Sequence, residues 1–222
     1  MTMNELEKQV LELIGEDSTN PDVFLDTDAG LEPIRDYLSD AIQEVVMLTG
    51  SHKRQYFLPL RKEQGFYRMS PSNGMFGWVT DAWLINKSYR LEQTGILKLL
   101  THDPNWMVTS ADPRAYFQIG ADVIAIYPKP SASSDALELT VVEIPDPYEN
   151  SDSRIKIKKD FHYAVVHFAV AEYWASRGDA LEARKHWGLY LDVLGLRQQF
   201  DQSPHFPRNL KTNKEPFPQV TA

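Results

Sequence analysis

The stretch that most constrains the fold runs from Asp160 to Leu194 and reads DFHYAVVHFAVAEYWASRGDALEARKHWGLYLDVL. Apolar residues recur every three or four positions on both sides of the Gly178-Asp179 pair, which is the spacing of two helices. Gly178 is a typical helix end, and Asp179 followed by Glu182 matches a capping box in which Glu182 reaches back to the cap. Because almost no loop separates the two helices, we expect an antiparallel helical hairpin.

Two further helices are expected before this hairpin, at residues 3–15 and 31–48. Gly50 follows the second of them at a position typical of a left-handed C-terminal cap. Asp26 or Thr27 is the candidate cap for the start of this helix, and Pro33 is tolerable only in a first helical turn. The apolar stripes of all four helices predict a bundle core. Its members are Leu31, Ile34, Leu38, Val45, Leu48, Phe161, Val165, Phe168, Trp187, Leu191 and Leu194.

Between residues 51 and 149 the pattern changes to short runs rich in aromatic and β-branched residues, with Gly, Pro, Asn and Asp between them. Such runs predict antiparallel strands, and residues 95–99 are counted among them. The fold class is therefore α+β: a helical bundle of N-terminal and C-terminal helices with an inserted antiparallel β domain and an extended C-terminal tail. The expected divisions are residues 1–50, 51–150, 151–200 and 201–222.

Composition narrows the classes of function. The 222 residues contain no cysteine, which excludes disulfides, thiolate nucleophiles and Cys-based zinc sites and fits a reducing compartment. The net charge of −8 gives no general affinity for nucleic acid, although an acidic wall could surround DNA without trapping it. No run of about 18 apolar residues is present, so no membrane-spanning helix is expected.

Motif searches identify no chemistry. No Gly-rich phosphate loop and no Gly-x-Ser-x-Gly nucleophile elbow occurs. His162 and His167 are five residues apart on an expected helix, so they point about 140° apart and do not suit a shared metal. We expect no catalytic, cofactor-binding or metal-binding residues, although a hydrolase that uses paired acids stays open as a third interpretation.

Aromatic residues of the strand region allow a second interpretation, a β-domain that binds carbohydrate or peptide as a tail or receptor-binding accessory protein does. A sheet core is the more usual role for such side chains. The residues concerned are Tyr67, Phe76, Trp78, Trp83, Tyr89, Trp106, Tyr116 and Phe117.

A basic cluster before the hairpin is either a solvated turn or a contact for an acidic partner. It consists of Arg154, Lys156, Lys158 and Lys159.

Five features follow one another in an order that resembles the head–tail adaptor (head-to-tail connector) proteins of bacteriophages. They are the helix 31–48 ending in Thr49-Gly50, the strand Tyr56-Phe57-Leu58-Pro59-Leu60, Asp112-Pro113-Arg114-Ala115-Tyr116 leading into a strand, Ile124-Ala125-Ile126-Tyr127-Pro128-Lys129-Pro130, and the helices 161–177 and 180–200 joined at Gly178-Asp179. Together they span residues 31–200.

The resemblance implies a structural role without catalysis or cofactor. Such subunits form a homo-oligomeric ring, commonly a dodecamer, that docks below the portal protein in the neck of the virion, between capsid and tail. The ring extends the DNA channel and offers an attachment surface for the tail, a nozzle or a second adaptor. DNA passes through the lumen without specific binding, and no membrane is involved. The subunits would be made in the cytoplasm of the bacterial host.

The last segment, residues 201–222, contains four prolines, which forbid a long helix. It is either a disordered tail or an extended arm that becomes ordered on a partner. In related connectors the C-terminal arm reaches the portal. The resemblance therefore implies portal contacts for Phe206, Arg208, Leu210, Lys211 and Phe217.

Overall fold

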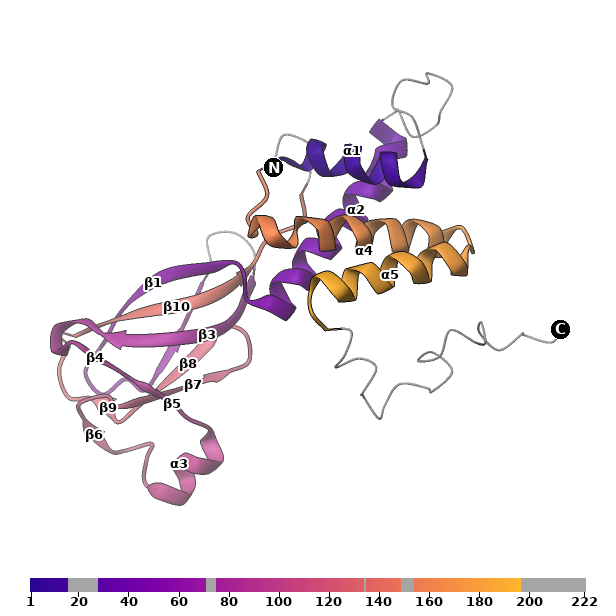
Figure 1. Ribbon diagram of the computed structural model, residues 1–222. Coiled ribbons are helices and arrows are strands. Elements are labelled where there is room, and N and C mark those ends of the chain that lie inside the picture. Colours follow the sequence, from indigo (N-terminus) through magenta and orange to yellow (C-terminus); the bar gives the residue numbers. More distant parts are fainter. Residues whose placement is uncertain (16–27, 71–74, 134, 149–153, 197–222) are drawn as a thin grey trace. The chain divides into compact units, whose positions relative to one another are not determined.

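The protein is of the α+β class, and Figure 1 shows its helices and strands. The computed structural model describes residues 1–15, 28–70, 75–133, 135–148 and 154–196. These residues form two compact units. The helical unit comprises Met1–Ala41, Tyr148–Ile155 and the chain from Lys159 onward, and the β unit comprises Ile42–Pro147 and Lys156–Lys158.

The helical unit begins with helix α1 (Met3–Ile14), which is capped at both ends. The Thr2 hydroxyl accepts a hydrogen bond from the Glu5 backbone N–H, and the Glu5 carboxylate accepts one from the Thr2 N–H, which together form a capping box. Helix α2 (Asp28–Thr49) contains Pro33 at its sixth position, just beyond the first turn to which the proline was expected to be confined. The candidate caps Asp26 and Thr27 lie outside the described residues. The buried Glu7 carboxylate of α1 accepts a hydrogen bond of 2.8 Å from Arg35 Nε of α2, which ties the two helices together.

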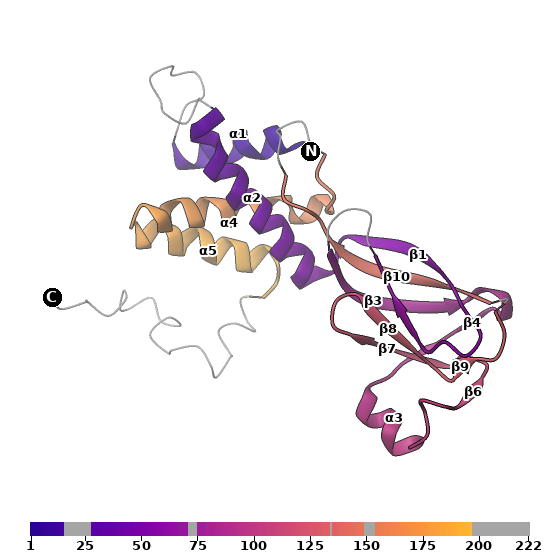
Figure 2. The same cartoon turned by 180° about the vertical axis from the view of Figure 1, so that it is seen from behind.

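The predicted hairpin is present as α4 (His162–Ser176) and α5 (Ala180–Val193), which lie side by side in both views (Figures 1 and 2). A short 3-10 turn, η3 (Lys159–Phe161), precedes α4. Asp179 caps α5 by accepting hydrogen bonds from the Leu181 and Glu182 N–H groups. The reciprocal half of the predicted box is replaced, because the Asp179 N–H donates to the Trp174 carbonyl and is not available to Glu182.

The β unit is a sandwich of two four-stranded sheets with one two-stranded ladder beside them. The first sheet has the order β1-β10-β3-β4, and the second has the order β2-β8-β7-β5. All pairs within these sheets are antiparallel except the parallel pair β5–β7. The strands are β1 (Lys53–Pro59), β2 (Phe66–Arg68), β3 (Met75–Leu84), β4 (Tyr89–Arg90), β5 (Glu92–Gln93), β6 (Ser110–Ala111), β7 (Ala115–Ile119), β8 (Val123–Tyr127), β9 (Lys129–Pro130) and β10 (Ala136–Ile144).

The core of the β unit lies between the two sheets. Alternate residues of each strand point into it, as the two-residue period of a strand requires. Leu139 of β10 and Ala82 of β3 come from the first sheet, whereas Tyr116 of β7 and Ile124 of β8 come from the second. Two short helical elements complete the unit: η2 (Ile85–Lys87) and α3 (Ile96–His102).

Two expectations fail here. Residues 95–99 were predicted as a strand but open helix α3, because Ile96, Leu99 and Leu100 have the three- and four-residue spacing of a short helix and only Leu99 is buried. Leu48 was expected in the bundle core but is 53% exposed. The physical reason is that Val46 is buried, and two residues are about 200° apart around a helix, so Leu48 points away from the buried side of α2.

Candidate functional site

Helix α3 and the loop after it expose a group of large apolar side chains, which we call the α3 surface. Five such residues occur within 13 positions: Ile96, Leu97, Leu100, Met107 and Val108. Leu97 is 77% exposed, although a leucine stabilises a fold chiefly by being buried. Scattered exposed apolar residues are ordinary, but a group in one short segment is typical of an interaction surface.

The α3 surface is held in place by a small hydrophobic cluster beneath it. Leu99 and Trp106 are buried there against Phe117 of β7 and Ala125 of β8. The rings of Trp106 and Phe117 meet edge to face at 5.6 Å. Because Tyr116 and Ile124 point into the sandwich core, their neighbours Phe117 and Ala125 point to the opposite, outer face of the second sheet. Helix α3 and the loop after it therefore cover that outer face, and the α3 surface is their side that is exposed to solvent.

A hydrogen-bonded turn fixes the loop between α3 and Trp106. The Asp103 carboxylate accepts hydrogen bonds from the Thr109 hydroxyl at 2.7 Å, from the Tyr127 hydroxyl at 2.9 Å and from the Asn105 backbone N–H at 2.9 Å. These bonds, that from Thr109 above all, hold the pKa of Asp103 below its ordinary value. Charge-assisted bonds of this kind keep the exposed leucines on a defined backbone.

A second exposed apolar group lies on the outer face of the first sheet, and we call it the outer-sheet surface. Strand register places Phe57 of β1, Glu138 of β10 and Trp83 of β3 in one row across the strands. Their neighbours Tyr56, Leu139 and Ala82 belong to the sandwich core, so this row points away from it. Phe57 is 66% exposed and Trp83 is 41% exposed.

Most of the aromatic residues that could have formed a carbohydrate platform are core residues instead. Tyr67, Phe76, Trp106, Tyr116 and Phe117 are buried, and Tyr89 is partly buried. Trp78 and Trp83 keep substantial exposure. The burial of the larger share favours a role in the sheet core for these residues over a sugar-stacking platform.

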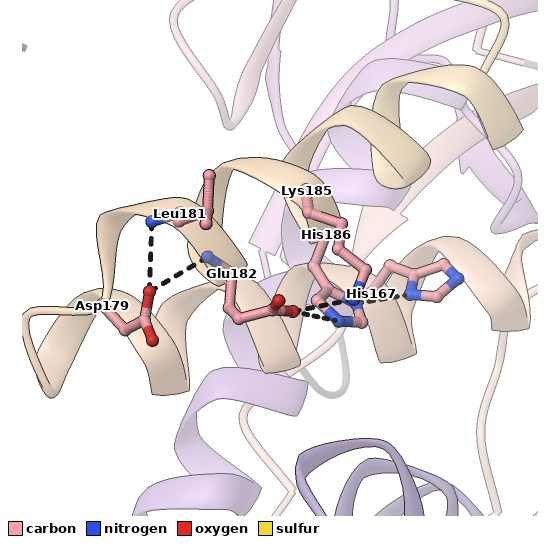
Figure 3. Close-up of polar contacts among 6 residues, drawn as sticks. All are labelled: His167, Asp179, Leu181, Glu182, Lys185 and His186. Atoms are coloured by element: carbon pink, nitrogen blue, oxygen red, sulfur yellow. Dashed lines mark hydrogen bonds and ion pairs between the residues drawn. The ribbon is translucent and has the colours of Figure 1, made fainter. Parts of the chain in front are cut away.

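The helical unit contains a buried pair of histidines that the sequence did not reveal. His167 of α4 and His186 of α5 approach with their Nδ1 atoms 3.0 Å apart (Figure 3). The spacing of 19 residues hides the pair, because only the antiparallel packing of the hairpin brings the two positions together. On the other side of His186, the Glu182 carboxylate lies 3.9 Å from Nε2 and accepts a hydrogen bond from Lys185 Nζ at 2.8 Å.

The contact between the two Nδ1 atoms restricts which nitrogen atoms of the histidine pair can carry a hydrogen. Two Nδ1 atoms in contact can share only one hydrogen, which one ring donates and the other accepts. Burial lowers the pKa of both histidines, and each has a nearby cation or imidazole that acts in the same direction, His186 beside His167 and Lys185 beside His186. Glu182 opposes the shift at His186. The pair is therefore a neutral structural contact of the hairpin.

The predicted bundle residues are distributed as follows. The buried ones are Ile34, Leu38, Val45, Val165, Phe168 and Leu191, and the partly buried ones are Leu31, Phe161, Trp187 and Leu194. The candidate portal-binding residues Phe206, Arg208, Leu210, Lys211 and Phe217 lie outside the described residues. In the basic cluster, Arg154, Lys156, Lys158 and Lys159 are exposed.

Two other kinds of site are absent from the part of the chain that the structure describes. Within the described ranges, no three His, Asp or Glu side chains converge as metal ligands would. None of the helices in these ranges combines the length and the apolar character needed to span a bilayer. The candidate functional feature of the described residues is exposed apolar surface, which is typical of contacts with other proteins.

A comparison with protein families agrees with this reading. The family model described as SU10 adaptor protein matches residues 1–209 of the chain. The match defines the class first: this is a bacteriophage head–tail adaptor, a structural component of the virion that assembles with portal and tail components. Within that class, the chain belongs to the SU10 adaptor protein family. No curated protein matches the chain.

Proposed function

We propose that the protein is the subunit of a closed ring, of twelve copies, that docks below the portal, extends the DNA channel and provides the surface to which the tail attaches. The observation that carries this proposal is the family match over residues 1–209, which covers both units of the chain. Such a subunit acts through its shape and its contacts with other proteins, and it catalyses no reaction. We therefore propose no enzymatic activity and no cofactor.

Exposed apolar side chains support a role in assembly. A ring of identical copies needs two different surfaces on each subunit, since each copy contacts one neighbour on either side. The α3 surface and the outer-sheet surface are two such groups within the β unit. Leu181 and Tyr163 of the helical unit are also largely exposed.

The charge of the chain supports a role in DNA passage. A net charge of −8 per copy, repeated around a ring, gives a wall that repels the phosphate backbone. A channel that DNA must leave rapidly needs weak binding, because each phosphate held by Lys or Arg slows its movement. In this proposal DNA passes through the lumen in the neck of the virion without sequence-specific contact.

The C-terminal arm, residues 201–222, is proposed as the contact with the portal. It combines apolar anchors with basic residues among four prolines, a composition suited to a segment that becomes ordered on a partner. The residues proposed to contact the portal are Phe206, Arg208, Leu210, Lys211 and Phe217.

The test is capture by purified portal rings, measured by native mass spectrometry and electron microscopy. The full chain should bind as a ring of twelve copies. A chain ending at Phe200 should keep its circular dichroism spectrum and lose portal binding. The matched control keeps residues 201–222 in scrambled order, so that length and composition are unchanged, and it should also fail to bind. Normal attachment of the truncated chain would refute the arm, and failure of the full chain to attach would refute the portal proposal.

A further inference from the structure

Helix α2 carries a row of exposed carboxylates, which we call the α2 acidic face. Glu32, Asp36 and Asp40 are exposed and follow one another at intervals of four residues. Each interval turns the helix by about 40° and advances it by about 6 Å, so the three side chains lie within an arc of about 80°. The other side of the helix is fixed in the helical unit, because Ile34 and Leu38 are buried there.

The fold of one copy leaves this face without a cation. Arg35 is the only basic residue of α2, and its side chain is bonded to Glu7 of α1. Within the described ranges, the carboxylates of Glu32, Asp36 and Asp40 form no ion pair or hydrogen bond. Like charges four residues apart repel each other and destabilise a helix, so the isolated subunit gains nothing from this arrangement.

The basic cluster before the hairpin has the opposite charge. All four of its side chains are exposed, and residues 154–160 are formally +3 (4 − 1) when Asp160 is included. Lys156 has a contact within the chain, whereas Arg154, Lys158 and Lys159 have no ion pair with any residue that the structure describes. The first and last members, Arg154 and Lys159, belong to the helical unit, as the α2 acidic face does.

The backbone of the basic cluster is anchored where it begins. Arg154 forms an antiparallel bridge with Thr2, and the Ile155 N–H donates a hydrogen bond of 3.3 Å to the Met1 carbonyl. The Ile155 side chain is buried. Both views show the chain that leads into α4 beginning beside the N-terminus (Figures 1 and 2). The charged side chains next to Ile155 therefore extend into solvent from a fixed backbone.

The two surfaces are complementary in number and in length. Three carboxylates without a cation on one surface correspond to three cations without a carboxylate on the other. The carboxylates extend over about 12 Å of helix, from Glu32 to Asp40. Arg154 and Lys158 are separated by at most about 14 Å of backbone. No ion pair among the described residues joins the two surfaces within one copy.

This complementarity selects a second copy of the chain in a head-to-tail contact. Either surface would repel an identical surface, so a twofold contact through one of them is excluded. A contact between two different surfaces of identical copies is heterologous, and it closes into a ring when each copy is rotated by a fixed angle.

We propose that the α2 acidic face of one copy binds the basic cluster of the next copy, and that these ion pairs set the direction in which subunits follow one another around the ring. The inference rests on the proposed ring and names a contact within it. Exposed ion pairs contribute little affinity individually, and their main effect is to fix orientation and exclude wrong pairings. In a closed ring the contact is repeated at every interface.

An exchange of charge between copies tests the contact. One variant of the full chain carries Asp36→Lys and Asp40→Lys, and the other carries Arg154→Glu and Lys159→Glu. On purified portal rings, each variant alone should give at least about tenfold fewer adaptor rings than the unmodified chain, because its two surfaces now have the same sign. An equal mixture should restore the rings, since every surface then meets its complement on the other variant. Native mass spectrometry should find equal numbers of the two variants in each restored ring.

Matched controls change the same charge at other exposed positions without a partner. Glu12→Lys with Asp146→Lys matches the first variant, and Lys8→Glu with Lys62→Glu matches the second. Each control should form rings alone. The folding of the first test variant should be preserved, because a lysine four residues after Glu32 is favourable in a helix, and circular dichroism checks this.

Rings made by the unmodified chain on the portal provide a measure of proximity. A carbodiimide joins a carboxylate to a lysine that it contacts. In rings assembled from ¹⁵N-labelled and unlabelled copies, it should link Asp36 or Asp40 of one copy to Lys158 or Lys159 of another, which mass spectrometry reads as mixed isotope pairs. Links found only within one copy would overturn the contact.

The other outcomes separate the contact from the ring. Normal rings from both test variants, or losses equal to those of the controls, would refute the contact and leave the ring intact. A loss in the first variant that mixing does not restore would also refute it, and would indicate that the α2 acidic face binds the portal. Failure of the unmodified chain to form rings would refute the ring and the contact together.

Discussion

Helices α4 and α3 are both rich in apolar residues, yet they use them in opposite ways. Ten of the 15 residues of α4 are buried, whereas Leu99 alone is buried among the seven of α3. Helix α4 packs against α1 on one side and α5 on another, so nearly all of its circumference is covered. Helix α3 rests on the outer face of a sheet and is covered on one side only.

The difference separates apolar residues that stabilise the fold from apolar residues that do not. Apolar residues that stabilise the fold are removed from water by the chain itself, at a gain of roughly 25 cal/mol per Å². Ile96, Leu97 and Leu100 remain in water, so the isolated subunit gains little from them. Large apolar residues that are grouped on a surface in this way are typical of a site that contacts another molecule.

The largest effect is expected in the core of the hairpin. Phe168→Ala removes a buried ring that lies 5.5 Å from the ring of Trp187 and 5.3 Å from that of Tyr190. Loss of this packing and the cavity that it leaves should lower the free energy of unfolding by about 3–5 kcal/mol. Urea denaturation followed by far-ultraviolet circular dichroism measures it. A loss below about 1 kcal/mol would mean that the packing of α4 against α5 contributes little to the stability of the fold.

The histidine pair should make the hairpin sensitive to acid. Burial lowers the folded-state pKa of His167 and His186, so below about pH 6.5 the unfolded chain binds more protons than the folded one. Stability is therefore complete above about pH 6.5 and falls as the pH drops toward the folded-state pKa values. Each histidine contributes at most about 1.4 kcal/mol per pH unit in that window. Denaturation curves between pH 7.5 and pH 5 give the slope.

Two variants test whether the histidine pair is the source of the change in the free energy of unfolding with pH. His186→Gln should reduce it, and His102→Gln, at an exposed position on α3, controls for the loss of an imidazole. Some slope should remain, because burial also lowers the pKa of His52 in the β unit, against the opposing effect of Glu143. A slope that is the same in His186→Gln and in the unmodified chain would show that the pair does not titrate with folding.

The sequence predicted the elements that local signals define. The apolar period and the Gly178-Asp179 joint located α4 and α5, and Gly50 adopts the expected left-handed conformation with φ of 58°. Those signals act over a few residues, so they can be read without knowing the fold. The α+β class followed from the order of the periodicities.

What the sequence did not predict depends on contacts between distant residues. His167 and His186 are brought together by hairpin packing, and no spacing rule marks them. Segment 95–99 was mistaken for a strand because a short apolar run fits either structure. The i, i+3, i+4 spacing of Ile96, Leu99 and Leu100 after Gly95 was the signal that could have found α3, and with it the α3 surface.

A smaller, local effect is expected at the turn that supports the α3 surface. Asp103→Ala removes the acceptor of hydrogen bonds from Thr109, Tyr127 and the Asn105 N–H. Amide hydrogen exchange in residues 96–109 should become about tenfold faster, since the turn loses its internal partners. Global unfolding should change little. Because its pKa is lowered in the folded state, Asp103 contributes stability that is lost only below about pH 4, clear of the histidine window.

The control for this effect is Asp112→Ala, which removes an exposed ion pair with Lys87 outside the turn. It should leave exchange in residues 96–109 unchanged. Equal acceleration by both substitutions would show that general loss of acidic charge, and not the hydrogen-bonded turn, controls the order of the α3 segment.

The smallest effect on folding is expected at Leu97, and it tests the contrast between the two helices most directly. Leu97→Ala removes three carbon atoms that are 77% exposed, so the free energy of unfolding of the monomer should change by no more than about 0.5 kcal/mol. The measurement is the one used for Phe168→Ala, made at a concentration where the chain is monomeric. A loss of several kcal/mol would mean that Leu97 packs within its own chain. The apolar residues of α3 would then stabilise the fold as those of α4 do. A negligible loss separates an exposed side chain that its own fold does not need from one that stabilises it.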